Sequence, residues 1–261
     1  MFSHLGKRNY SPREAMKYEN LLDVLQRIGV QVIWQDNNSG NKGIADRVKY
    51  TSLSHERDAV LCSSTECYDE ILLQNLGRLL CDNKDDLLVV LHQKGSHGPS
   101  YYKRSPREFK LFLPECDRED VQNCDRQSII NAYDNTIVYT DHLLARVIDL
   151  LKAQEYPTAM LYVSDHGESL GENGIYLHGL PRAIAPRPQT HVPMIFWASP
   201  KFYEAKAIDP LLLAGSRSQP YSHQFLFHSL LGLFDVQTAV YQTNLDLFFP
   251  ARKQASSPKL P

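Results

Sequence analysis

The sequence predicts an α/β protein with a mostly parallel sheet and helices on both of its faces. Four apolar runs have the length and composition of buried strands, and they alternate with segments of helical periodicity. Such alternation is typical of a parallel sheet between two layers of helices. At 261 residues, of which 43% are apolar, the chain is long enough to bury the core of one large domain. The expected strands are 30–34, 87–91, 158–163 and 192–197.

Amphipathic patterns predict four main helices, at residues 11–28, 67–81, 128–151 and 222–234. Ser11 followed by Pro12 is a suitable start for the first of them. Because no linker interrupts the alternation, we expect a single domain over residues 1–249. Residues 250–261 are polar and contain proline, so we expect a disordered tail there.

Composition excludes several classes of function. A net charge of -2 gives no basic field that would favour nucleic acid as a partner. No run of 18 apolar residues is present, and the N-terminus lacks the apolar core of a signal peptide. Neither a Gly-x-Gly-x-x-Gly turn nor a phosphate-binding P-loop motif occurs, which argues against dinucleotide and P-loop nucleotide sites.

The five cysteines point to an oxidising compartment. Cys62 and Cys67 lie close together in a polar segment, as do Cys116 and Cys124. Two such pairs favour two small disulfide-closed loops. A zinc site of four thiolates is the alternative, but neither pair has the C-x2-C spacing of a zinc ribbon. Cys81 remains unpaired and is expected to be a buried apolar residue of a helix.

Two of the predicted strands end in loops that contain histidine. Asp165 and His166 follow the third strand directly, and His178 closes the same glycine-rich loop. His97, between glycines, follows the second strand. The carboxyl ends of parallel strands are where α/β proteins usually bind ligands. A carboxylate and an imidazole together suit zinc or manganese, so Asp165 and His166 are the first candidate metal ligands.

A third loop, residues 35–43, follows the first strand and contains Lys42, which could contact an anion. His97 and His178 would then bind a second metal or the anionic group. Such a site suits phosphoryl or sulfuryl transfer, where positioning and charge stabilisation dominate catalysis. No threonine, serine or cysteine lies after an early strand in the position that a covalent nucleophile requires.

The segment SDHGESLGENG at 164–174, followed by YLHG at 176–179, resembles the signature of the lipid A phosphoethanolamine transferases. These are sulfatase-like members of the alkaline phosphatase superfamily. The resemblance extends over nearly the whole chain. It includes both cysteine pairs and the segments MFS at 1–3, DNNSG at 36–40, KG at 42–43, GSHGP at 95–99, INAYDN at 130–135 and VP at 192–193.

This resemblance implies an alkaline-phosphatase-like fold and zinc as the cofactor. It implies transfer of phosphoethanolamine from phosphatidylethanolamine to lipid A, a lipopolysaccharide modification linked to polymyxin resistance. It also implies an inner-membrane enzyme whose catalytic domain lies in the periplasm, and we expect a monomer. The acceptor glycolipid and the number of zinc ions are left open.

Carried over by position, the resemblance makes Asp165 and His166 zinc ligands. His97 and His178 would bind the phosphoethanolamine group or a second zinc, and Lys42 would assist with the phosphate. The cysteines would form two of the family's disulfides, Cys62–Cys67 and Cys116–Cys124.

The chain departs from the family at its beginning. In the family, a strand with a metal-binding glutamate and then a threonine nucleophile precede the segment that starts at Met1 here. We therefore expect an N-terminally truncated domain that lacks the first catalytic strand and is impaired or inactive alone. A metal-dependent phosphohydrolase or sulfatase, and a non-catalytic remnant, are the alternatives.

Overall fold

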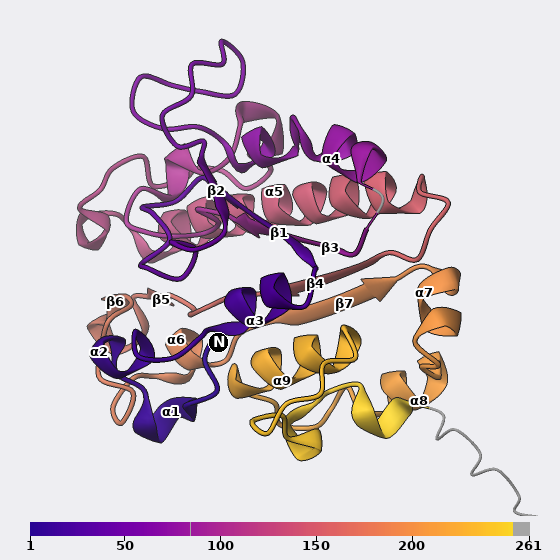
Figure 1. Cartoon of the computed structure of the whole chain (residues 1–261). Helices are drawn as coiled ribbons and strands as arrows, with labels where there is room; N and C mark the ends of the chain where they lie inside the picture. Colours follow the sequence, from indigo (N-terminus) through magenta and orange to yellow (C-terminus); the bar gives the residue numbers. More distant parts are fainter. Residues whose placement is uncertain (84, 253–261) are drawn as a thin grey trace, which may run out of the picture.

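A three-stranded parallel sheet forms one half of the fold (Figure 1). Its order is β2–β1–β3, with β1 at Gln31–Asp36, β2 at Lys49–Ser52 and β3 at Leu87–His92. The computed structural model describes residues 1–83 and 85–252 of the chain. Strands β1 and β3 pair in register from Gln31 opposite Leu87 to Asp36 opposite His92. The predicted parallel strands 30–34 and 87–91 are confirmed, and β2 was not predicted from the sequence.

The other half is a two-stranded antiparallel sheet of β4, Ala159–Val163, and β7, Met194–Ala198. Both strands lie where the sequence predicts them. β7 runs antiparallel to β4 because the chain turns back through the loop that contains His166 and His178. Among the described residues no ladder joins β3 to β4, so the two halves are separate sheets.

Strands β3 and β4 were expected to be buried, and that prediction is wrong. Every residue of β3 and of β4 is only partly buried, whereas five of the six residues of β1 are fully buried. The cause is a cavity of about 1980 Å³ that both strands line. An apolar strand at the edge of such a cavity keeps solvent access although its side chains suit a core.

Helix α5, Arg126–Lys152, confirms the longest predicted helix. Asp125 caps it by accepting the backbone N–H of Ser128 at 3.0 Å. The predicted helix 67–81 is instead two pieces, a 3-10 helix at Asp69–Leu73 and α4 at Leu76–Asp82. Cys81 is exposed on α4, so its predicted burial is wrong.

The predicted helix 11–28 is also divided, into α2 at Pro12–Ala15 and α3 at Leu21–Arg27. Asn20 starts a new helix because its side chain accepts the N–H groups of Leu22 and Asp23, while Asp23 accepts the N–H of Asn20. This capping box makes position 20 a helix start rather than a helix interior.

Helix α9, Gln224–Leu233, confirms the last predicted helix and packs with α3 and β1 in one apolar core. Helix α5 packs with α4 in another core, so helices cover both sides of the strands (Figure 1). The remaining elements are short. They are α1 at Gly6–Asn9, β5 at Ser169–Leu170, β6 at Tyr176–Leu177, α6 at Arg187–Thr190, α7 at Pro200–Ala205, α8 at Pro210–Gly215 and 3-10 turns at Tyr101–Lys103, Arg107–Phe109, Val121–Asn123, Glu172–Gly174, Thr243–Leu245 and Phe249–Ala251.

Both predicted disulfides, Cys62–Cys67 and Cys116–Cys124, are present. Within the segment expected to be a disordered tail, Ala251 is buried and Arg252 forms a bridge with Ile208. Residues 253–261 lie outside the described residues. No helix in the described part of the chain is long and apolar enough to cross a membrane.

Candidate metal centre

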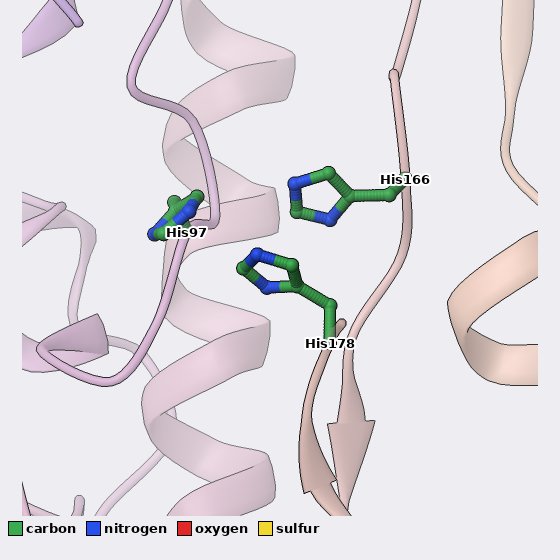
Figure 2. A group of neighbouring side chains, drawn as sticks. All are labelled: His97, His166 and His178. Carbon is green, nitrogen blue, oxygen red and sulfur yellow. The ribbon is translucent and has the colours of Figure 1, made fainter. Parts of the chain in front are cut away.

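Three histidines from three segments meet at one point (Figure 2). One ligand atom from each of His97, His166 and His178 lies within 4.8 Å of the other two. His97 follows β3 and His166 follows β4, whereas His178 comes directly after β6. The two candidate histidine loops of the sequence therefore converge, and His178 joins them.

Hydrogen bonds orient the three imidazole rings in the same way. Nδ1 of His97 lies 2.6 Å from the carbonyl oxygen of Gly98, and Nδ1 of His166 lies 3.2 Å from that of Gly167. Because a carbonyl oxygen can only accept, each Nδ1 must donate its hydrogen. Nε2 of both rings then has a free lone pair, which is the state of a metal-ligating imidazole.

Glu168 gives His178 the same tautomer. Its Oε1 atom lies 3.1 Å from Nδ1 of His178 and accepts the backbone N–H of Gly98 at 3.1 Å. The glutamate is buried, so this one carboxylate links the His97 loop to His178. A carboxylate behind a histidine is a common arrangement in zinc sites. Glu168 was not predicted from the sequence as a site residue, because its position in the motif does not reveal which imidazole it contacts.

Asp165 lies beside the histidines and not among them. Its side chain is 72% exposed, and Oδ1 is 3.8 Å from Nε2 of His166. The same oxygen accepts the backbone N–H of His166 at 3.0 Å. A carboxylate at this distance could approach an ion that the histidines hold, so its role as a ligand stays a prediction.

Lys42 lines the same cavity as His97 and His166. Its Nζ atom donates to the hydroxyl of Ser39 at 3.0 Å and to the carbonyl oxygen of Ser39 at 3.3 Å. The predicted contact with a phosphate therefore requires the lysine to leave these exposed partners. That contact stays a prediction.

A buried carboxylate shapes the loop that contains His97. Asp69 accepts the backbone N–H groups of Lys94 at 2.9 Å and Gly95 at 2.7 Å, and the side chain of Asn37 at 2.8 Å. Burial raises the pKa of the Asp69 carboxyl, while these N–H donors oppose that shift. The loop is thus fixed at its start by a side chain from a distant segment.

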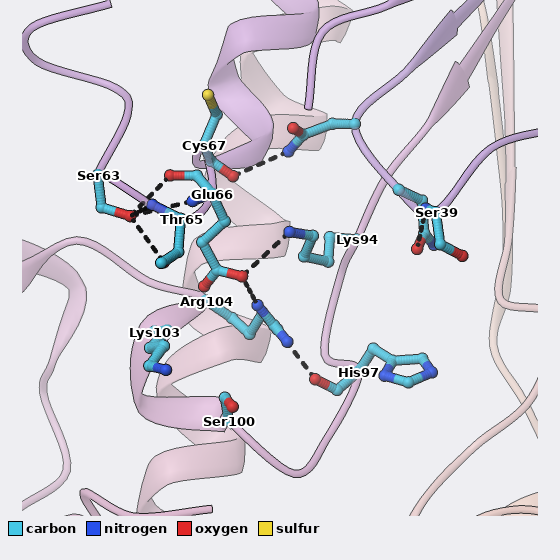
Figure 3. A network of polar contacts seen from close by, with 12 residues as sticks. Ser39, Ser63, Thr65, Glu66, Cys67, Lys94, His97, Ser100, Lys103 and Arg104 are labelled. Atoms are coloured by element: carbon cyan, nitrogen blue, oxygen red, sulfur yellow. Dashed lines mark hydrogen bonds and ion pairs between the residues drawn. The ribbon is translucent and has the colours of Figure 1, made fainter. Parts of the chain in front are cut away.

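An ion-pair network holds the other side of this loop (Figure 3). Arg104 donates from Nε to the carbonyl oxygen of His97 at 3.0 Å and pairs through Nη1 with Glu66. Glu66 also pairs with Lys94 at 3.0 Å. Since Glu66 precedes Cys67, the Cys62–Cys67 disulfide fixes the segment on which this network depends.

Two glycines allow the loops to approach one another. A Cβ atom on Gly98 would lie 2.6 Å from the Leu177 side chain, and one on Gly167 would lie 2.0 Å from the Pro188 carbonyl oxygen. At Gly167 the obstacle is backbone, so no side chain fits there, whereas a side chain at Gly98 would require the Leu177 and Tyr101 side chains to move. The glycines of the predicted loops thus serve close packing around the histidines.

Two tyrosines, the buried Tyr101 and the partly buried Tyr133, lie near Glu168. Burial and the nearby Glu168 carboxylate raise the pKa of Tyr101, and the same two causes raise the pKa of Tyr133 to about 12. The rings of Tyr101 and Tyr133 pack edge to face, with centroids 5.6 Å apart. Both phenols therefore remain neutral in the range where zinc enzymes work.

The sulfatase family model matches residues 1–236. The chain belongs to the sulfatase family. It is 44% identical over 256 residues to phosphoethanolamine transferase EptA of Salmonella typhimurium, covering 97% of this chain and 47% of that protein. It is 43% identical to phosphatidylethanolamine transferase Mcr-2 of Escherichia coli, covering 90% of this chain and 44% of that protein. The chain thus spans about half the length of these relatives.

Solved structures agree with the sequence matches. The soluble domain of lipooligosaccharide phosphoethanolamine transferase A from Neisseria meningitidis superposes with a TM-score of 0.94 at 39% identity, covering 97% of this chain and 77% of that domain. The C-terminal periplasmic domain of phosphoethanolamine transferase EptC from Campylobacter jejuni superposes with a TM-score of 0.84 at 45% identity, covering 97% of this chain and 77% of that domain. A protein of the alkaline phosphatase superfamily from Vibrio parahaemolyticus, at 14% identity, shares the fold with a TM-score of 0.54. The predicted alkaline-phosphatase-like fold is confirmed.

Proposed function

We propose that this chain forms the zinc-binding part of a phosphoethanolamine transferase, with phosphatidylethanolamine as donor and lipid A as acceptor. Relatives with 44% and 43% identity are named for transfer of phosphoethanolamine or phosphatidylethanolamine. Because the chain spans about half of those relatives, the complete reaction is a proposal for this chain.

The observation that supports the proposal best is the common orientation of three imidazoles. His97, His166 and His178 each direct Nδ1 at an acceptor, which leaves Nε2 available to an ion. Nitrogen donors from three histidines are a usual set for catalytic zinc. Zinc held there would supply a Lewis acid that neutralises developing charge on phosphoryl oxygens.

The other residues of the site would bind and position the transferred group. Asp165 would supply an oxygen ligand, since its Oδ1 lies 3.8 Å from Nε2 of His166, and Lys42 is a cation on the wall of the same cavity. We propose that Lys42 exchanges Ser39 for a phosphate oxygen when the donor binds. Glu168 would accept the Nδ1 hydrogen of His178 and so orient Nε2 toward the ion.

We propose that the described residues do not supply a hydroxyl nucleophile. In residues 1–83 and 85–252, no serine or threonine hydroxyl bonds to an imidazole nitrogen of the three histidines. The nearby Ser164 hydroxyl instead donates to the carbonyl oxygen of His166 at 2.6 Å. We therefore propose that the 261 residues alone bind zinc and the head group but transfer it slowly or not at all.

The proposed location is the periplasmic side of the inner membrane. Two disulfides suit an oxidising compartment. One related structure is described as an integral membrane protein and others as periplasmic domains. A monomer is the expected state of the catalytic domain.

Zinc binding is the first test. Calorimetric titration of the purified chain with zinc should give a dissociation constant below about 1 μM, and His178→Ala should weaken it at least about tenfold. His55→Ala, which removes an exposed histidine outside the cluster, should leave the affinity unchanged. Equal affinity in His178→Ala and the wild type would overturn the zinc assignment.

Head-group binding is the second test. The zinc-loaded chain should bind phosphoethanolamine, and Lys42→Ala should weaken that binding about fivefold through loss of one charge-assisted hydrogen bond. Ethanolamine without phosphate should not compete. Stronger binding of sulfate than of phosphoethanolamine would contradict the transferase assignment and favour a sulfatase.

A further inference from the structure

Residues 180–187 form an exposed apolar turn next to the histidine cluster. Every residue from 178 to 184 is exposed to solvent, and so is Arg187. Two of the exposed side chains are large and apolar, with Leu180 at 38% and Ile184 at 68% of full exposure. Neighbouring exposed apolar side chains, bordered by polar residues, are a mark of interaction surfaces.

Hydrogen bonds and prolines order the backbone of this apolar turn. The N–H groups of Ile184 and Ala185 both donate to the carbonyl oxygen of Pro181, at 2.9 Å each. Prolines at positions 181, 186 and 188 fix the φ angle of their own residues. Because the turn is already formed, little conformational freedom is lost when it binds a partner.

Both ends of the apolar turn are attached to the histidine cluster. His178 lies two residues before its start. Just after its end, the buried Gln189 donates from Nε2 to the hydroxyl of Ser169 at 3.0 Å, and its carbonyl oxygen accepts the N–H of Gly167 at 3.1 Å. Gly167 directly follows one of the clustered histidines. Figure 1 shows β6 and α6, the elements at the two ends of the turn, on the same side of the molecule.

This part of the chain has only positive formal charge. No aspartate or glutamate occurs from residue 173 to residue 203, whereas Arg182 and Arg187 are both exposed. Where the structure describes the chain, no residue from 179 to 200 belongs to an ion pair, and the pairs on either side are those of His178 and Lys201. The two guanidinium groups are therefore available to an anionic partner.

Charge distinguishes the apolar turn from another exposed apolar segment. Leu111 and Leu113 are exposed at 66% and 68%. The residues that follow them are mainly acidic, with carboxylates at positions 115, 117, 119 and 120. Anionic lipid attracts basic segments, so this second segment has the apolar side chains but lacks the favourable charge.

We propose that the apolar turn binds the surface of an anionic phospholipid bilayer. Leu180 and Ile184 enter the boundary between head groups and acyl chains, which removes apolar area from water. Arg182 and Arg187 pair with lipid phosphates. A stable protein interface needs about 20 residues on each side, which this short turn does not offer.

Binding of the turn keeps the histidine cluster at the lipid surface, since His178 is two residues from Leu180. The inference goes beyond the proposed function, because the contact needs neither zinc nor a transferred group. Vesicles without phosphatidylethanolamine test it. A negative result would therefore leave the proposed transfer reaction untouched.

Vesicle flotation is the first test. The purified 261-residue chain should bind vesicles of phosphatidylglycerol and phosphatidylcholine at least about fivefold more tightly than vesicles of phosphatidylcholine alone. An increase in salt from about 0.1 M to about 0.5 M should weaken the binding, because salt screens exposed charges. Absence of binding to the anionic vesicles, or equal binding to both kinds, would overturn the proposal.

Substitutions separate the apolar and the charged contributions. Ile184→Ser, and the double variant Arg182→Gln with Arg187→Gln, should each weaken binding to the anionic vesicles at least about fivefold. Leu113→Ser is the matched control, since Leu113 and Ile184 are both 68% exposed. It should change the binding less than about twofold. Equal losses in Leu113→Ser and Ile184→Ser would show that the apolar turn is not the contact.

A fluorescent label locates the contact. Cys81 is the free cysteine among the described residues, so Cys81→Ser gives a background for labelling. In that background an environment-sensitive dye on Ile184→Cys should shift its emission to shorter wavelength with anionic vesicles, because the dye leaves water. The same dye on Leu113→Cys should not respond. A response at position 113 without one at position 184 would contradict the assignment.

Discussion

Glu168 and His178 form, among the described residues, the one contact in the candidate metal centre in which a buried carboxylate holds an imidazole. The Oε1 to Nδ1 distance is 3.1 Å, and the same oxygen accepts the N–H of Gly98. Glu168 Oε2 is buried without a partner among the described residues. The carboxylate therefore contacts the histidine and is shielded from solvent.

Glu168→Gln should lower zinc affinity about tenfold, because the amide supports the required His178 tautomer less strongly and buries an unpaired NH₂ group. Calorimetric titration measures this. Glu172→Gln is the control, since that carboxylate accepts the N–H of Leu170 and contacts no imidazole. Unchanged zinc affinity in Glu168→Gln would remove the positioning role.

Arg104→Ala should destabilise the fold by about 2 kcal/mol, because it removes the donor to the His97 carbonyl oxygen and leaves the partly buried Glu66 with Lys94 alone. Urea unfolding measures the change in free energy. Lys103→Ala breaks an exposed pair with Glu119 and should cost less than about 1 kcal/mol. Similar losses in both variants would show that the Glu66 network does not hold the loop.

Asp69→Asn should cost about 1–3 kcal/mol, since an amide cannot accept from Asn37, Lys94 and Gly95 together. The His97 loop should also become more mobile, which hydrogen exchange at Lys94 and Gly95 would detect. Asp86→Asn, at an exposed position, is the control. If exchange at these two amides stays the same, Asp69 does not shape the loop.

Asp23 should make stability depend on pH in the acid range. Burial raises the pKa of its carboxyl, but the bonds from Arg47 and Asn20 outweigh burial, and the net pKa lies below the ordinary value of 3.8. A lowered pKa stabilises the fold above pH 3.8, and this contribution disappears as the pH falls through the folded-state pKa.

Asp23→Ala should therefore cost about 1–2 kcal/mol at pH 7, and the difference from the wild type should narrow as the pH falls below 3.8. Urea unfolding at several pH values measures this. Glu19→Ala, which breaks an exposed pair with Arg27, should show no such trend. A difference that is constant with pH would contradict the linkage.

The sequence predicted the local features of the fold well. Strand positions, the long helix α5 and both disulfides depend on residues that are neighbours in the chain, and all are confirmed. The division of residues 11–28 was missed although Asn20 and Asp23 are a local capping signal. The spacing of apolar residues continues on both sides of Asn20, and it therefore indicated one helix in place of two.

The supporting contacts of the site could not be read from the sequence. Glu66 and Arg104 are 38 residues apart, and Glu168 and Gly98 are 70 apart. Pairings of this kind depend on how loops return to the sheet edge. His97 and His166 were found because each follows an apolar strand, and His178 because it closes the same glycine-rich loop as His166. The mutual contact of the three histidines is a property of the folded chain.

The stacked rings of His166 and His178, with centroids 3.9 Å apart, stand next to His97 from the other sheet. The candidate metal centre is therefore also a contact between the two sheets, at one end of their strands. An ion bound there would link the sheet of β3 to the sheet of β4 at the carboxyl ends of these two strands.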